Sequence, residues 1–318
     1  MTTRPLVIIN PASAGGKTGQ QWPKYASAVR AILPDCDFCP TQQSGDATEI
    51  TRAYVLNGGR RIVSVGGDGT LHEVINGLIS KEGIAHAPDV HLSTRPMGTG
   101  SDFCRSLGMP RDIHSAIQTL NSPTKSVDIG WVETIDHDPP KSSAFINIGS
   151  FGLSGAVAKQ QKEEGKSGAL SYVTGILKAI RSYKNQKIQI KLTDQRQKVQ
   201  TLRQSIFTFA IGNGQYFGNG MRITPKASIT NGTFVCVLCG DLNGFEVLQR
   251  LPALFKGSHV DKPKFYVFNQ VLEVEAYPDE SRESPVWIEL DGELFDTLPA
   301  RFRIIPSAVM MSCAHKPF

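Results

Sequence analysis

The stretch RIVSVGGDGTLHEVINGL, residues 61–78, decides the fold class. Its first part, Arg61–Val65, is an apolar run typical of a buried strand, and Thr70–Leu78 carries a helical pattern. The glycines between them allow a sharp strand-to-helix turn and leave no side chain between the backbone and a ligand. Because a helix N-terminus attracts anions, the stretch predicts a phosphate-bearing ligand at this turn.

Asp68 stands inside that turn, where a phosphate is expected. A carboxylate at this place repels the phosphate, which is unfavourable unless a nearby cation offsets the repulsion or the carboxylate has a role in proton transfer. The structural alternative is that Asp68 only caps the helix that follows. We favour a ligand site, because glycines flank Asp68 on both sides and Thr70 and Glu73 follow it.

The first 130 residues alternate short strands with helices, which implies a parallel sheet covered on both faces. The expected strands are Leu6–Ile9, Arg61–Val65 and Val90–Thr94; the expected helices are Gln20–Leu33, Asp46–Leu56 (with Asp46 as a possible N-cap), Thr70–Leu78, Asp102–Leu107 and Asp112–Leu120.

Two more small-residue turns follow strands in this part. The turn NPASAGGKTG, residues 10–19, has Pro11 where a P-loop needs its first glycine, but its small residues still let backbone N–H groups approach a phosphate. The turn PMGTGSDF, residues 96–103, opens a helix at Asp102, which taken alone reads as an N-cap. His72 and Phe103 occupy the last glycine position of the dinucleotide pattern, which argues against a nicotinamide-dependent oxidoreductase.

The second half is rich in β-strands and typical of an antiparallel sandwich. The expected strands are Ala144–Ile148, Lys187–Leu192, Ser205–Ile211, Thr233–Leu238, Lys264–Ala276, Val286–Leu290 and Arg301–Ile305, and the expected helices are Gly168–Tyr183 and Gly244–Lys256. We place the domain boundary between Lys125 and Lys141, and predict domains at 1–130 and 131–318. The last strand of the chain can pair with the sheet of the first domain.

Length and composition fit two globular domains in 318 residues, with 40% hydrophobic and 20% charged residues. The net charge of +5 suits weak attraction to nucleotide phosphates or an anionic lipid surface, and no nucleic-acid-binding motif is present. No apolar run approaches the roughly 20 residues that span a bilayer. We expect a cytoplasmic protein, with any membrane contact peripheral at the inner face; the sequence does not indicate an oligomeric state.

Six cysteines include two C-x-x-C pairs, Cys36/Cys39 and Cys236/Cys239, which in principle could hold zinc. Residues three apart in a strand point to opposite faces, so Cys236 and Cys239 chelate poorly. We expect ordinary reduced cysteines.

Motifs in the same order and spacing along nearly the whole chain resemble the diacylglycerol-kinase catalytic-domain family, particularly its soluble bacterial lipid kinases, with sphingosine kinases as more distant relatives. The matching residues are Asn10-Pro11, Thr41, Gly45-Asp46-Ala47, Gly66 to Thr70, Glu73, Asn76-Gly77-Leu78, Gly98 to Phe103, Leu107-Gly108, Asp128-Ile129-Gly130, Gly212-Asn213-Gly214, Pro225-Lys226-Ala227 and Leu290-Asp291-Gly292-Glu293.

The resemblance implies an N-terminal α/β nucleotide-binding domain of the NAD kinase/phosphofructokinase type, a C-terminal β-sandwich for the lipid, and ATP and Mg²⁺ as cofactors. It implies a nucleotide site at Asn10, Ser13, Thr41, Gly66, Gly67, Asp68, Gly69, Thr70, Glu73, Gly98 and Thr99. It implies metal-linked roles for Asp68, Asp102, Asp128 and Asn231, and catalytic roles for Asp291, Asp68 and Glu293. Bacterial members suggest Asp291 as the base, and sphingosine kinases suggest Asp68; we favour Asp291.

The chain departs from the family pattern in three places. Ser101 replaces the usual asparagine, Asn231 stands in a turn that usually has aspartate, and Ala14-Gly15-Gly16 alters the first loop. A neutral Asn231 weakens any structural magnesium site there.

Two questions stay open at this stage. Val173, Ile176, Leu177 and Ile180 share one helical face, which fits either a membrane surface or packing on the sandwich. The expected activity is transfer of the γ-phosphate of ATP to a lipid hydroxyl, of diacylglycerol or a related lipid alcohol. The alternatives are an NAD kinase, a sugar kinase, or a catalytically silent lipid- or nucleotide-binding regulator.

Overall fold

The parallel sheet of the first domain lies between two layers of helices. This computed structural model describes residues 3–98, 100–110, 112–165, 183–280 and 284–313. In it, β1 (Leu6–Ile9) lies between β2 (Asp37–Pro40) and β3 (Arg61–Gly66), and β4 (His91–Pro96) adds to β3, all in parallel. Leu6 and Ile8 point into one core and Val7 and Ile9 into another, as the two-residue period of a strand requires.

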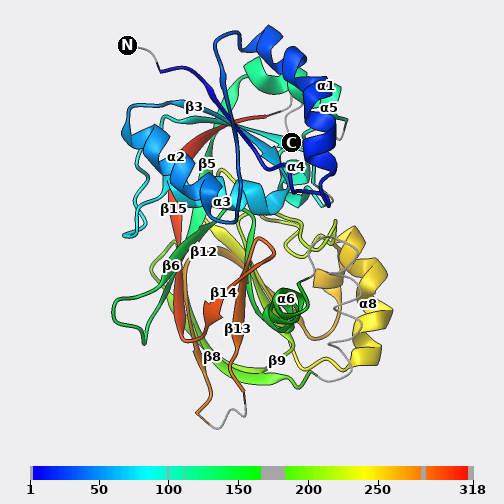
Figure 1. Cartoon of the computed structure of the whole chain (residues 1–318). Helices are drawn as coiled ribbons and strands as arrows, with labels where there is room; N and C mark the ends of the chain where they lie inside the picture. Colours follow the sequence, from blue (N-terminus) through cyan, green and yellow to red (C-terminus); the bar gives the residue numbers. More distant parts are fainter. Residues whose placement is uncertain (1–2, 99, 111, 166–182, 281–283, 314–318) are drawn as a thin grey trace.

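Helices cover both faces of this sheet (Figure 1). The helices are α1 (Lys17–Ile32), α2 (Asp46–Leu56), α3 (Asp68–Leu78), α4 (Asp102–Ser106) and α5 (Ile113–Gln118), with a 3-10 turn, η1, at Thr119–Asn121. Residues of α2 and α3 share the core of Leu6 and Ile8, whereas α1 and α5 pack on the opposite face. The predicted α/β class is therefore confirmed.

The second half forms antiparallel sheets. Its strands are β5 (Thr124–Thr134), β6 (Ser142–Phe145), β7 (Ile148–Gly152), β8 (Gln186–Asp194), β9 (Val199–Ile206), β10 (Thr208–Gly212), β11 (Phe234–Cys239), β12 (Phe265–Pro278), β13 (Trp287–Leu290), β14 (Glu293–Thr297) and β15 (Ala300–Ser312). The helices are α6 (Leu153–Glu163) and α8 (Gly244–Lys256), followed by a 3-10 turn, η2, at Ser258–Asp261.

The last strand, β15, joins the two halves into one continuous sheet (Figure 1). Its first part pairs antiparallel with β5 and β12. After an irregularity between Ile305 and Val309, Met310 and Met311 pair in parallel with β4. Because the chain crosses back through this strand, the first domain contains residues from both ends of the sequence.

Several local predictions need correction. The N-cap of α2 is Gly45, whereas Asp46 is the first helical residue and accepts hydrogen bonds from the backbone of Gln42 and Gln43. The predicted strand Ser205–Ile211 is two strands that break at Phe207, and Ala144–Ile148 spans the end of β6 and the start of β7. The predicted helix Gly168–Tyr183 lies, except for Tyr183, outside the described part of the chain.

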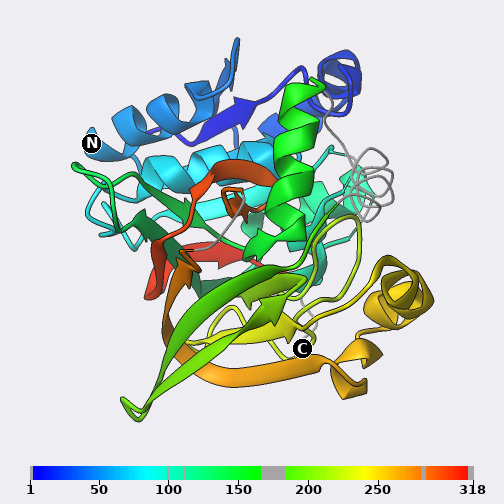
Figure 2. The same cartoon turned by 90° about the horizontal axis from the view of Figure 1, so that it is seen from below.

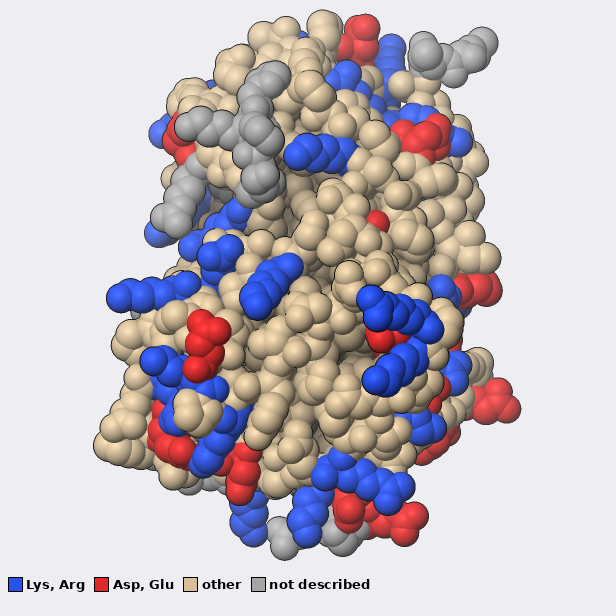
Figure 3. All heavy atoms as spheres, turned by 180° about the vertical axis from the view of Figure 1, so that it is seen from behind, with Lys and Arg blue, Asp and Glu red and all other residues tan. Residues whose placement is uncertain are grey.

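Cys236 and Cys239 lie in β11 and point into different cores, which confirms that this pair is split across the strand. The rear surface carries basic and acidic side chains mixed together, so the net positive charge is spread out there (Figure 3). Among the described residues, no helix combines the length and apolarity needed to cross a bilayer.

Candidate active site

A cleft of about 870 Å³ collects most of the predicted site residues. Its wall includes Asn10, Ser13, Thr41, Gly67, Asp68, Gly69, Thr70, Glu73, Gly98, Asp102, Asp291 and Glu293. Gly66 lies behind the wall, where a Cβ would come 2.3 Å from Thr70 Oγ1. Asp128 and Asn231 do not line the cleft, and Thr99 is outside the described residues.

The turns after β3 and β4 pack backbone against backbone in this cleft. A Cβ on Gly98 would lie 2.4 Å from the Cα of Gly67, so only glycine permits this approach. The N-termini of α3 and α4 begin at these two turns. The N-terminus of α3 has no side-chain cap, so its N–H groups give the cleft a surface suited to an anionic ligand.

Asp68 caps α4 and not its own helix. Its carboxylate accepts hydrogen bonds from the backbone N–H groups of Asp102 at 3.0 Å and Phe103 at 3.3 Å, whereas Gly67 is the N-cap of α3. Burial, followed by the negative charge of Asp102, raises the pKa of Asp68 to about 6 despite these bonds. The alternative in which Asp68 caps the helix that follows it is wrong, and the carboxylate is left in an environment that disfavours its charge.

Asp102 is the second carboxylate of this pair, and it is not the N-cap of α4, which is Ser101. Its Oδ2 accepts a hydrogen bond from Asn219 N at 2.8 Å, and Arg105 Nε lies 3.4 Å from Oδ1. Burial raises the pKa of Asp102, while Asn219 and Arg105 act in the opposite direction. Among the described side chains, buried Oδ1 has no hydrogen-bond partner.

These two carboxylates fit a divalent cation. Adjacent acidic groups whose pKa values are raised, one with a buried oxygen that lacks a hydrogen bond, are stabilised by an added positive charge. Oxygen ligands are those that Mg²⁺ prefers. No set of three or more His, Cys, Asp or Glu side chains within the described ranges is arranged to hold a metal by itself, so further ligands would come from water and phosphate.

Asp128 and Asn231, the other residues of the predicted metal set, lie together elsewhere. The two oxygens of Asp128 accept hydrogen bonds from Gly232 N at 2.6 Å and Ser307 N at 2.8 Å. Asn231 Oδ1 accepts from the backbone and hydroxyl of Thr233. Backbone donors thus occupy Asp128 in a structural role that fastens the 229–232 turn to β15.

The first loop and Glu73 hold the cleft wall in place. Asn10 Nδ2 donates to Thr70 Oγ1 at 3.1 Å, which ties the loop after β1 to α3. Glu73 accepts hydrogen bonds from Gly45 N and Ala47 N, at 3.0 and 3.1 Å, at the N-terminus of α2. Both oxygens of Glu73 are therefore used in positioning α2, although the residue borders the cleft.

Asp291 and Gly292 form the two-residue loop of the β13–β14 hairpin. Leu290 pairs with Glu293, and the φ angles of Asp291 and Gly292 are 53° and 95°. Positive φ at both positions is typical of a type I′ turn, for which Asp-Gly is a preferred sequence. A Cβ on Gly69 would lie 2.9 Å from Glu293 Oε1, so this hairpin reaches the glycine turn of α3.

The carboxylate of Asp291 is held by four donors. Oδ1 accepts from the backbone N–H groups of Asn147 and Ile148, at 2.9 and 3.0 Å. Oδ2 accepts from Ile146 N at 2.9 Å and lies 3.1 Å from His72 Nδ1. A carboxylate offers about four acceptor positions, so these contacts fix its orientation.

His72 was not predicted as a site residue, although it follows Asp68 by one helical turn. Burial alone would lower the pKa of His72, but the hydrogen bond and charge of Asp291, together with Glu293 and Glu73, raise it. A protonated His72 donates to Asp291 through Nδ1. The spacing of four residues on α3 was the available signal, because it puts His72 on the same helix face as Asp68.

Glu289, another residue that sequence reasoning missed, is fully buried beneath the hairpin. Thr208 Oγ1 donates to Phe151 O at 3.0 Å, Ser154 and Thr208 hydroxyls are 3.1 Å apart, and Ser150 Oγ donates to Ser154 at 2.7 Å. Each hydroxyl has one hydrogen, so Ser150 has none left for its contact with Glu289. Glu289 must supply that hydrogen itself, which agrees with burial raising its pKa to about 7. Its other oxygen accepts from Gly292 N and so fastens the hairpin turn.

We expect Glu289→Gln to remove a pH dependence of folding. The pKa of Glu289 is about 7 in the folded chain against an ordinary 4.5, so the wild type loses stability as pH rises between these values. Glutamine keeps an uncharged donor for Ser150. The variant should be more stable than wild type at pH 8 by on the order of 1–3 kcal/mol, and equal to it near pH 4.5. Urea unfolding at both pH values measures this; a variant less stable than wild type at pH 8 would show that burial does not raise the pKa of Glu289.

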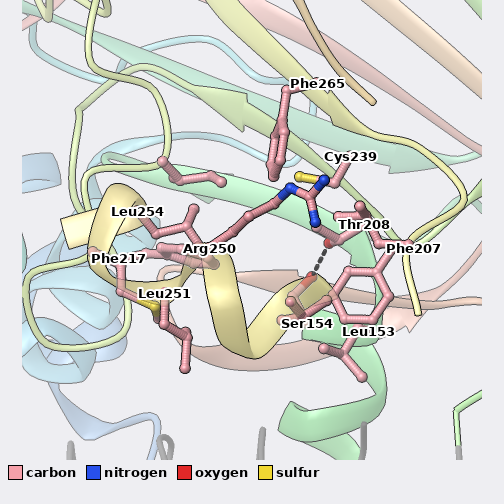
Figure 4. A pocket seen from close by; sticks show the side chains of 14 residues that line it. Leu153, Ser154, Phe207, Thr208, Phe217, Cys239, Arg250, Leu251, Leu254 and Phe265 are labelled. Atoms are coloured by element: carbon pink, nitrogen blue, oxygen red, sulfur yellow. Dashed lines mark hydrogen bonds between the residues drawn. The ribbon is translucent and has the colours of Figure 1, made fainter. Parts of the chain in front are cut away.

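The same hydroxyl chain ends at a small apolar pocket of about 50 Å³ between α6, α8 and the sheet (Figure 4). Ser154 and Thr208 form its polar edge, and Leu153, Phe207, Leu254 and Phe265 supply apolar walls. The guanidinium of Arg250 extends into this space (Figure 4). The pocket can take a few methylene groups next to one cation.

Two family models match this chain. The diacylglycerol kinase catalytic domain matches residues 4–132, and the YegS C-terminal NAD kinase beta sandwich-like domain matches residues 148–313. The diacylglycerol kinase of Staphylococcus carnosus is 24% identical over 305 residues, which cover 95% of this chain and 92% of that protein. The probable YegS-like lipid kinase of Chromohalobacter salexigens is 26% identical over 276 residues, which cover 86% of this chain and 82% of that protein.

Solved structures show the same fold. A putative diacylglycerol kinase from Bacillus anthracis aligns with a TM-score of 0.75 at 23% identity and covers 98% of this chain and 95% of its own. A yeast NADH kinase complexed with NADH aligns with a TM-score of 0.53 at 10% identity, over 98% of this chain and 84% of its own. Both identities are low, so these likenesses speak for the fold alone.

Proposed function

This chain belongs to the family that joins a diacylglycerol kinase catalytic domain to a YegS C-terminal NAD kinase beta sandwich-like domain, and on that premise we propose that it transfers the γ-phosphate of ATP to a lipid hydroxyl. Diacylglycerol or a related lipid alcohol is the proposed acceptor class. The observation that carries the proposal is one cleft in which the glycine turns of β3 and β4 face the Asp291 hairpin.

The glycine turns supply the phosphate site in this proposal. Backbone N–H groups at the N-terminus of α3 would bind phosphate oxygens, and Asp68 and Asp102 would hold Mg²⁺. When bound, the ion neutralises charge on the phosphates. Phosphoryl transfer needs little more from a protein than positioning and this charge neutralisation.

Asp291 is the proposed base for the lipid hydroxyl. Three backbone N–H groups hold its carboxylate, and His72 is the one side-chain donor in contact with it among the described residues. The acceptor positions are full while His72 donates, so an incoming hydroxyl must take the place of the His72 hydrogen on Oδ2. His72 is a positioning residue in this scheme, and Glu293 lies beside the glycine turn.

A panel of acceptors tests the activity. The purified chain is incubated with Mg²⁺ and γ-labelled ATP, and with diacylglycerol, phosphatidylglycerol, a sphingoid base or NAD. We expect label in a lipid product and none without Mg²⁺. Label transferred to NAD alone would identify an NAD kinase, and ATP binding without transfer to any acceptor would identify a silent regulator.

A further inference from the structure

Helix α8 has an apolar arc that is wider than the face it buries. Its inner face contributes Val247, Leu251 and Leu254 to the apolar pocket. On its outer face, Phe245 is 69%, Leu248 44% and Phe255 47% exposed. At 3.6 residues per turn, these outer side chains fall within an arc of roughly 80°. An amphipathic helix normally buries its apolar face, so this exposed part of the apolar arc needs an explanation.

The outer face is a concentration of exposed apolar surface. Seven large apolar side chains are exposed among the described residues. Three of them, Leu56, Ile84 and Val199, are far apart in the sequence, whereas the other four lie between Phe245 and Tyr266. Figures 1 and 2 both place α8 at the outer margin of the molecule, where a flat partner can reach it. Clustered exposed apolar residues mark an interaction site, whereas single ones do not.

Positive charge surrounds the C-terminal end of this face. Glu246 on α8 is neutralised by Lys264 Nζ at 2.8 Å. Lys226, Lys256 and Lys262 are exposed, and none of them forms an ion pair with any described residue, while Asp261 is the one exposed acid in the η2 turn. Lys226 is near α8 because a Cβ on Gly257 would lie 3.0 Å from Pro225 Cβ. An apolar helix face bordered by unpaired lysines matches an anionic bilayer surface.

We propose that the outer face of α8 docks on an anionic lipid bilayer. Phe245, Leu248 and Phe255 enter the boundary between headgroups and acyl chains, and Lys226, Lys256 and Lys262 meet lipid phosphates. Docking in this way brings the apolar pocket, which the same helix lines, close to the bilayer. The inference rests on the proposed function, since a lipid acceptor is drawn from a membrane.

Flotation with vesicles tests the surface. The full chain is mixed with vesicles of phosphatidylcholine alone or with phosphatidylglycerol added. We expect binding that depends on phosphatidylglycerol and weakens at high salt. The combined variant Phe245→Ser, Leu248→Ser, Phe255→Ser should bind at least tenfold more weakly, and Lys226→Gln, Lys256→Gln, Lys262→Gln should lose the preference for phosphatidylglycerol. The matched control Leu56→Ser, Ile84→Ser, Val199→Ser removes equally exposed apolar side chains elsewhere and should bind as wild type does.

Kinase activity separates failure of this inference from failure of the proposed function. With a dispersed short-chain diacylglycerol, the serine variant of α8 should match wild type, whereas with vesicle-embedded acceptor its rate should fall at least tenfold. If the wild type binds vesicles but phosphorylates no lipid, the docking surface is supported and the proposed function is not. Vesicle binding unchanged in the α8 variant would overturn the inference. A wild-type dimer that the α8 substitutions dissociate, with vesicle binding intact, would instead assign the face to a second copy.

Discussion

Asp291→Asn is expected to lower kcat for lipid phosphorylation by about 10²–10⁴-fold, the usual contribution of a general base. Asparagine keeps an oxygen for the backbone N–H groups of Asn147 and Ile148 but cannot accept a proton. ATP binding should change little, because the glycine turns and the Asp68–Asp102 pair do not depend on Asp291 for their contacts. Single-turnover rates and ATP affinity, measured on the same preparation, check both halves of the prediction.

Stability must be measured beside activity in this variant. The amide NH₂ of the introduced asparagine would take the place of Oδ2 and face both Ile146 N and the His72 ring, which costs on the order of 1–3 kcal/mol. A thermal melt shows whether the chain is still folded at the assay temperature. Asp35→Asn, in the exposed turn before β2, is the matched control, with no expected effect on either measurement. A folded Asp291→Asn protein with near wild-type kcat would remove Asp291 from the role of base.

Sequence pattern predicted the fold well where local signals were strong. Helices α2 and α8 have the predicted bounds, Asp46–Leu56 and Gly244–Lys256. Strand β2 was missed because it has only four residues, is half-exposed and ends at Pro40. The Glu293–Thr297 strand was missed because its pairing depends on the Asp291-Gly292 turn and on a partner strand. Neither of these is visible as an alternation of apolar and polar residues within the strand.

Contacts between distant residues of the candidate site could not be predicted from the sequence. Glycine turns and carboxylates have recognisable patterns, so the cleft residues could be named in advance. The contact between Asp291 and His72 joins positions 219 residues apart, and no local pattern encodes it. The acid Glu289 was hidden for a similar reason, since its neutral state follows from a count of hydrogens over β7, α6 and β10. Resemblance grouped Asp128 with Asp68, whereas only Asp68 lines the cleft.

Asp68→Asn is expected to lower activity by at least about 10²-fold while making the ligand-free protein more stable. Loss of a metal ligand removes several kcal/mol of charge stabilisation in the transition state, which is 10²-fold or more in rate. Burial and Asp102 raise the pKa of Asp68 from 3.8 to about 6, so its ionised form destabilises the empty cleft above that pH. Asparagine removes this cost of a buried charge but weakens the 3.3 Å hydrogen bond from Phe103 N. The net increase in the free energy of unfolding should be about 1 kcal/mol at pH 8.

A substitution that raises the stability of the free protein but lowers its activity identifies a carboxylate that serves ligand binding. A substitution that lowers the stability identifies a carboxylate that serves the fold. Asp128→Asn is the contrast, because backbone donors occupy both oxygens of Asp128 outside the cleft. It should lower the unfolding free energy by about 1–3 kcal/mol and leave the Mg²⁺ dependence of ATP binding unchanged. Chemical unfolding without ligand, and calorimetric titration of ATP at several Mg²⁺ concentrations, measure the two effects. If Asp68→Asn destabilises the free protein and binds Mg²⁺ and ATP normally, then Asp68 is a helix cap and the magnesium site lies elsewhere.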